Sequence, residues 1–89
     1  MSEHSQTEAE ILRLAAAAGA GRSISPTEVA RALAPGPGDA WRSRLTAIRR
    51  AAIRLAEAGQ IDILRKGKPV AAADARGVIR LRLRGAEDG

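Results

Sequence analysis

The sequence predicts a single, mostly helical α+β domain in which three helices precede a small antiparallel β-hairpin. Three observations predict it. Apolar residues recur at helical spacing in three segments, each bounded by Ser, Thr, Pro, Asp or Gly residues typical of helix ends. After residue 59 the apolar period changes to two, as in half-buried strands. A length of 89 residues suits one domain with a thin hydrophobic core.

The first helix is expected over residues 8–18. Thr7 and Glu10 have the spacing of a capping box, in which a hydroxyl and a carboxylate bind the free amides of a helix start. Apolar residues recur on one face from Ile11 onward, and Gly19 favours an end to the helix.

The second helix has the clearest start in the chain. The segment Ser25–Glu28 offers a capping serine, a proline at the first helical position and a glutamate at the third. Ile24 and Val29 have the spacing of a hydrophobic staple across this start. We expect the helix to end near Ala34, because Pro and Gly fill the connector at residues 35–38.

The third and longest helix is expected over residues 39–58, with Asp39 as its cap and Gly59 as its stop. Its apolar residues form one narrow stripe: Trp41, Leu45, Ile48, Ala52 and Leu55. We therefore expect Trp41 in the core. Nucleic-acid-binding proteins that stack bases generally use more than one aromatic residue, and Trp41 is the only one here.

Two strands are expected at residues 61–65 and 78–84, the second alternating strictly between aliphatic residues and arginines. A long loop over residues 66–77 joins them, and residues 22–24 suit a short third strand against this hairpin. This order of elements is that of a winged helix-turn-helix, in which the last helix enters the major groove of DNA and the hairpin loop reaches the neighbouring backbone or minor groove. The domain is predicted over residues 7–84, with disordered tails at 1–6 and 85–89.

Basic residues are concentrated in the second half of the chain. The whole chain carries a net charge of +5, but from Arg42 to Arg84 twelve basic residues face only Glu57, Asp62 and Asp74, a local charge of +9. Such a surface attracts polyanions. The alternative is compositional bias, since a GC-rich genome yields Ala- and Arg-rich proteins. The scarcity of acidic residues in this half favours the functional interpretation.

The candidate nucleic-acid-binding residues lie on the third helix and in the loop between the strands. On the helix, three arginines suit contact with phosphate or guanine and two hydroxyls suit base edges: Arg42, Arg49, Arg50, Ser43 and Thr46. In the loop, phosphate contact is expected for Lys66, Lys68 and Arg76. The alternative for both groups is an ordinary solvated surface. For three further arginines, Arg80, Arg82 and Arg84, the preferred interpretation is the solvent-exposed face of a strand.

The chain resembles a family of short bacterial proteins of unknown function that are predicted to be winged helices. The resemblance covers roughly residues 10–84 and is carried by six segments in order: Ile11–Leu14, Ser25–Leu33, Trp41–Arg42, Ile48–Ala52, Lys66–Val70 and Arg76–Leu81. It implies the fold and supplies no activity. The chain departs from the pattern in a longer connector at residues 35–39 and in the alanine run at residues 71–73.

The sequence favours a binding protein over an enzyme. It has no cysteine, no paired carboxylates with a catalytic spacing and no metal-ligand cluster, so we expect no catalytic residues, metal or cofactor. No secretory signal, membrane span or small-molecule substrate is evident, and a cytoplasmic location is expected. The expected partner is double-stranded DNA, as for a small transcriptional regulator. The alternative is a winged helix that docks an acidic protein or a second copy of itself without binding DNA.

Overall fold

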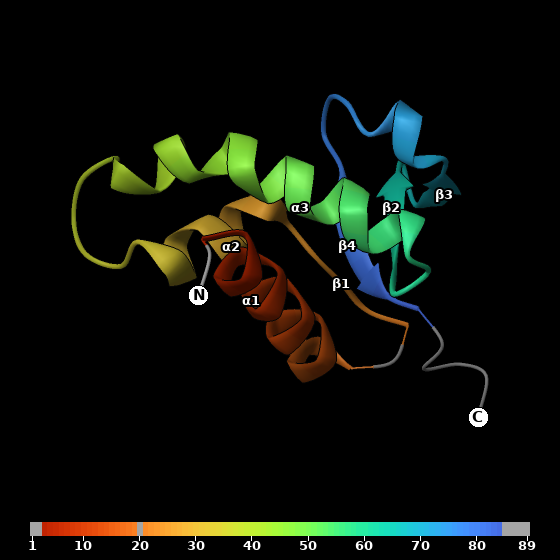
Figure 1. The fold of residues 1–89 in the computed structure, drawn as a ribbon, viewed down its shortest axis with the longest axis horizontal. Coiled ribbons are helices and arrows are strands. Elements are labelled where there is room, and N and C mark those ends of the chain that lie inside the picture. Colours follow the sequence, from red (N-terminus) through yellow and green to blue (C-terminus); the bar gives the residue numbers. More distant parts are fainter. Residues whose placement is uncertain (1–2, 20, 85–89) are drawn as a thin grey trace.

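The computed structural model describes residues 3–19 and 21–84, and the side chains among these from Ser5 onward. Three α-helices, α1 (Glu3–Ala18), α2 (Pro26–Leu33) and α3 (Leu45–Glu57), pack against one side of a small sheet (Figure 1). The strands are β1 (Ser23–Ile24), β2 (Ile61–Arg65), β3 (Lys68–Val70) and β4 (Arg80–Leu83). Two short 3-10 helices, η1 (Ala40–Arg44) and η2 (Ala72–Asp74), complete the order. The arrangement is α+β and fits the predicted winged-helix-like fold.

The sheet is antiparallel throughout, with the strand order β1-β4-β2-β3. The short third strand predicted at residues 22–24 is confirmed, since Ile24 pairs with Leu81 of β4. Leu81 also pairs with Ile63 of β2. All three side chains are buried in the core cluster, so one face of the sheet packs on the helices and the other is left without a helix.

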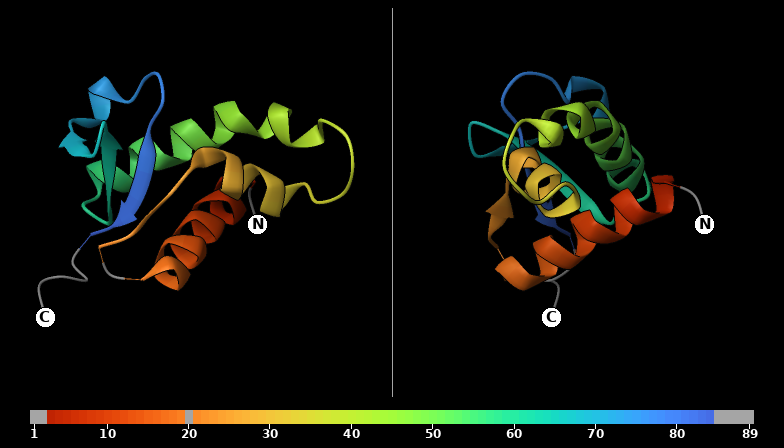
Figure 2. Two further views of the ribbon diagram at one scale, coloured as in Figure 1. Left: turned by 180° about the vertical axis from the view of Figure 1, so that it is seen from behind. Right: turned by 90° about the vertical axis from the view of Figure 1, so that its left-hand side faces the viewer.

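The core is built where the helical stripes meet this sheet face. Ile11, Val29 and Ile48, one from each α-helix, are fully buried. Trp41 lies in η1 and packs against the core cluster, but it is only half-buried. The expectation of a buried tryptophan is therefore met in part. Figure 2 shows α3 passing between α1 and the segment that follows β3.

The predicted start of α2 is confirmed in detail. The Ser25 hydroxyl accepts a hydrogen bond from the Glu28 amide at 3.1 Å, and the Glu28 carboxylate accepts one from the Ser25 amide at 2.7 Å. The predicted stop of α3 is also confirmed: Gly59 has φ +79°, and the amide of Gln60 donates to the carbonyl of Leu55 at 2.9 Å. These bonds satisfy backbone groups that a helix end would otherwise leave unpaired.

Two predicted helix starts are wrong. Helix α1 begins at Glu3, and Thr7 lies inside it, 3% exposed, so its capping-box spacing is coincidental. The predicted helix over residues 39–58 is divided, because its first turn is η1 and α3 begins only at Leu45. Asp39 makes no side-chain cap. Its carboxylate lies 3.6 Å from Nε of Arg42 instead.

The predicted loop over residues 66–77 contains an additional strand, β3, joined to β2 by a two-residue turn. Lys66 and Gly67 have φ +53° and +81°, as a type I′ hairpin turn requires. The alternating strand is shorter than predicted and begins at Arg80, which leaves Val78 outside it and 90% exposed. The predicted C-terminal tail at residues 85–89 lies outside the described residues.

Candidate nucleic-acid interface

The wing, defined here as residues 65–79, consists of the β2–β3 turn, β3, η2 and the loop that leads to β4. It has little regular structure of its own, and Arg49 of α3 holds it in place. The Arg49 guanidinium donates hydrogen bonds to the carbonyl oxygens of Gly77 at 2.9 Å and Ala75 at 3.5 Å. Arg49 is half-buried by these contacts. The sequence predicted that Arg49 contacts DNA; in the structure its guanidinium binds the wing and positions it beside α3.

The other predicted residues of the third helix lie at its exposed side. Arg42 has its guanidinium carbon 4.8 Å from the centre of the Trp41 ring. The Ser43 hydroxyl donates to the carbonyl of Ala40 at 2.9 Å, within η1. Thr46 and Arg50 are exposed. Arg50 makes no hydrogen bond or ion pair with any described residue, so its guanidinium is available to a partner.

Arg31, which the sequence did not single out, joins Arg42 at the tryptophan. Its guanidinium carbon lies 4.7 Å from the same ring centre, so two cations contact one aromatic ring. The two arginines come from α2 and η1, and their spacing in the sequence gave no signal of this contact. With both guanidiniums against it, the ring is not an open platform for a base.

The three predicted wing residues are all exposed. Lys66 lies in the β2–β3 turn, Lys68 on the edge strand β3, and Arg76 in the loop beside the Arg49 contact. None of them forms an ion pair with a residue that the structure describes. Arg65, which was not among the predicted residues, belongs with them: its Nη2 lies 3.9 Å from the position that a Cβ on Gly77 would take.

Other arginines of the basic half are bound within the protein. Arg80 donates to the hydroxyl and carbonyl oxygens of Ser23 at 2.7 and 2.9 Å, and Arg54 donates to Glu8 at 2.6 Å. Arg82 and Arg84 both bind the carboxylate of Asp62 at 2.8 Å. The row of arginines on β4 is therefore not a free phosphate track.

Asp62 is the most buried carboxylate of the described chain, with 7% of its surface exposed. The hydrogen bond from Arg82 lowers its pKa below the ordinary aspartate value, although burial opposes this, and Arg84 lowers the pKa further. Asp62 is thus charged at neutral pH and pairs with both arginines at the end of the sheet opposite the β2–β3 turn.

The acidic groups leave the wing positive. Five of the described carboxylates are bound to groups outside the wing: Glu8 to Arg54, Glu10 to Arg13, Glu28 to Ser25, Asp39 to Arg42, and Asp62 to two arginines. Within the wing, Asp74 is the one carboxylate beside four cations, a local charge of +3. Within the +9 half of the sequence, Asp62 thus offsets part of the charge of Arg82 and Arg84, whereas the wing keeps a charge of +3.

The described residues hold no group of three His, Cys, Asp or Glu side chains that would bind a metal ion. No helix within residues 3–19 and 21–84 has the length and hydrophobicity needed to cross a membrane. The sequence profile of a family described as "Protein of unknown function (DUF3253)" matches residues 4–84. No curated protein matches the chain.

Proposed function

We propose that this chain, which belongs to the DUF3253 family of proteins of unknown function, is a small DNA-binding protein that holds duplex DNA against its wing and the exposed side of α3. A transcriptional regulator is the role that such a surface would suit. The cytoplasmic location expected from the absence of cysteine agrees with this role.

The observation that carries the proposal is the set of cations that the fold leaves unneutralised. Arg65, Lys66, Lys68 and Arg76 gather on one short segment, while most of the described carboxylates are bound elsewhere. A concentrated positive surface gains free energy on meeting DNA because it releases condensed counterions. Compositional bias accounts for the number of arginines, but it does not account for this separation.

The conformation of Lys66 supports the same proposal. It is the one non-glycine residue with positive φ in the described chain. A left-handed conformation costs a lysine about 1–2 kcal/mol, whereas asparagine or glycine would adopt it readily. The turn nevertheless keeps an exposed ammonium group at its tip. Local strain of this kind is typical of functional positions.

The contribution of α3 is divided between contact and positioning. Arg50 and Thr46 are exposed and suit contact with phosphate or base edges. Arg49 fixes the loop that carries Arg76, so it would set the distance between the two parts of the surface. We therefore assign base and phosphate contact to the exposed pair and a mainly positioning role to Arg49.

The proposal is tested by fluorescence anisotropy of a labelled mixed-sequence duplex at several salt concentrations. Five cations, four in the wing and Arg50, predict a slope of log affinity against log salt of about −4.5. The Lys68→Gln protein should bind more weakly, with a slope shallower by about 1. Arg13→Gln removes the same charge from α1 and should leave the slope unchanged.

Two results would contradict the proposal: no binding at low salt, or binding whose affinity does not depend on salt. The alternative of a protein-docking module has less support, because Val78 is the one large hydrophobic residue that the described chain exposes. Single exposed apolar residues are ordinary on protein surfaces. Nucleic acid that co-purifies with the protein and is removed by high salt would favour the DNA-binding role.

A further inference from the structure

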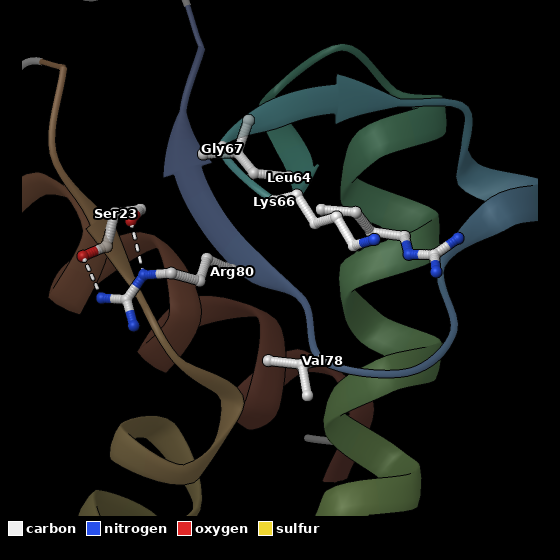
Figure 3. Close-up of a pocket in the computed structure, with 7 residues that line it drawn as sticks. Ser23, Leu64, Lys66, Gly67, Val78 and Arg80 are labelled. Atoms are coloured by element: carbon white, nitrogen blue, oxygen red, sulfur yellow. Dashed lines mark hydrogen bonds between the residues drawn. The ribbon is translucent and has the colours of Figure 1, made fainter.

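A pocket of about 430 Å³ lies on the face of the sheet that carries no helix. In Figure 3, Ser23 and Arg80 form one side, Leu64, Lys66 and Gly67 form the other, and Val78 lies at the end nearest α3. The alternation of the strands explains this set. Ile24, Ile63 and Leu81 point into the core, so their neighbours Ser23, Leu64 and Arg80 point to the opposite face.

The pocket combines an apolar surface with a basic rim. Leu64 is 6% exposed yet does not belong to the main core cluster, and Val78 exposes 90% of its surface. Arg65, Lys66 and Arg80 supply three cations, and no acidic residue lines the pocket. A ligand that covered Val78 and faced these cations would gain both hydrophobic contact and charge pairing.

Part of this site is held in place before any ligand arrives. Two hydrogen bonds, at 2.7 and 2.9 Å, fix the Arg80 guanidinium on Ser23 (Figure 3). Leu64 and Arg80 face each other across the β2–β4 pair, so the floor is a sheet and not a loop. Preformed pockets of several hundred Å³ that combine apolar surface with a few polar groups are typical of small-molecule sites.

We propose that this pocket binds a small organic anion with an apolar body and one carboxylate. The body would lie against Val78 and Leu64, and the carboxylate would face Arg65 and Lys66, neither of which is paired with a described residue. A compact ligand fits the site better than an extended peptide does. The peptide would need a free strand edge, but Arg80 occupies the Ser23 carbonyl of β1, and β3 contains Pro69.

The ligand site shares Arg65 and Lys66 with the surface proposed to bind DNA. An anion in the pocket would neutralise part of that surface and reduce its affinity for DNA, which would make the ligand a negative effector. This consequence rests on the proposed function. Binding of the anion itself does not.

The direct test is a titration of the isotopically labelled protein, followed by NMR amide shifts, with 2-naphthoate and with octanoate. We expect saturable shifts concentrated at residues 64–67 and 78–80, with a Kd of roughly 0.1–1 mM for the better of the two. Val78→Ser should weaken binding at least about tenfold, since a ligand-covered valine contributes this order of affinity. Val78 is exposed, so the substitution leaves the core intact. Acetate, which lacks the apolar body, and 2-naphthol, which lacks the carboxylate, serve as control ligands. Arg13→Gln, on α1, serves as the control substitution outside the pocket.

Saturable shifts that need both halves of the ligand and are lost in Val78→Ser support the proposal. It is overturned if neither probe gives saturable shifts, if acetate gives the same shifts, or if Val78→Ser binds as tightly as the native protein. In a second arm, 2-naphthoate should release labelled duplex from the protein. Because the NMR titration contains no DNA, a protein that binds naphthoate and no duplex would contradict the DNA-binding function alone.

Discussion

Arg49 and Gly77 are joined by a hydrogen bond of 2.9 Å between the guanidinium Nη2 and the carbonyl oxygen, across 28 residues of sequence. With the longer bond to the Ala75 carbonyl, this contact fastens the last part of the wing to the middle of α3. A guanidinium presents several donors in a fixed plane, so one side chain can hold two carbonyls of a loop that has no ladder of its own.

Arg49→Lys should therefore loosen the wing although it keeps the charge. A lysine ammonium on a flexible stem does not reproduce the two-carbonyl contact. We expect the free energy of unfolding, measured with urea, to fall by about 1 kcal/mol, and amide exchange at residues 75–79 to accelerate. Arg50→Lys is the matched control, since Arg50 is exposed and unpaired within the described residues. Equal stability of the two variants would refute the positioning role of Arg49.

Asp62 should make the fold sensitive to acid. Its pKa is lowered in the folded protein, mainly by the hydrogen bond from Arg82, so its stabilisation is present above the ordinary aspartate pKa. That stabilisation is lost as pH falls below about 4 toward the folded-state pKa. We expect Asp62→Asn to lower the free energy of unfolding by about 2 kcal/mol at pH 7, because two arginines lose their carboxylate. When both proteins are unfolded at lower pH, the difference between their free energies of unfolding should become smaller.

Glu10→Gln provides the comparison for Asp62. Its pKa is also lowered by a hydrogen bond, from Arg13, but that partner is largely exposed on α1. Solvent screens such a pair, so the substitution should change stability by less than about 0.5 kcal/mol. If the pH-dependent change in the free energy of unfolding were larger for Glu10→Gln than for Asp62→Asn, burial would not explain the contribution of Asp62 to stability.

The elements that the sequence predicted at their observed positions have local causes. Helix α2 begins where Ser25, Pro26 and Glu28 agree, and β2 follows the change of period after Gly59. The helix starts predicted at Thr7 and Asp39 were wrong, because a residue of suitable type and spacing caps a helix only if the backbone also changes conformation there. At Thr7 the helix simply continues from upstream, and at Asp39 the chain enters a 3-10 turn.

The site was less predictable, because its pairings join distant residues. Arg54 meets Glu8 across 46 positions, and Arg80 meets Ser23 across 57. No periodicity in the sequence predicts such contacts, so the sequence does not distinguish an arginine that is bound within the protein from one that is free. The β2–β3 turn was missed for a different reason: Lys66-Gly67 lacks the asparagine or aspartate that usually marks a type I′ turn.

Ser25→Ala should destabilise the protein through α2 alone. The substitution removes the hydroxyl that accepts a hydrogen bond from the Glu28 amide. A capping serine contributes about 1 kcal/mol to the free energy of unfolding. Ser25→Asn keeps a capping oxygen and should restore most of the loss. Thermal unfolding of the three proteins measures the difference. Similar losses in both variants would indicate that the site tolerates no change of side chain and that capping is not the cause.

Lys66→Asn should separate the stability of the turn from its proposed function. Asparagine adopts the left-handed conformation more readily than lysine, so the free energy of unfolding should rise by about 0.5–1 kcal/mol. The same substitution removes a wing cation, so affinity for duplex DNA should fall and the salt slope should become shallower by about 1. Lys68→Gln, on the adjacent strand, should lose the same binding without gaining stability. If Lys66→Asn bound DNA as tightly as the native protein, a phosphate contact by Lys66 would be ruled out as the reason for a lysine in this strained turn.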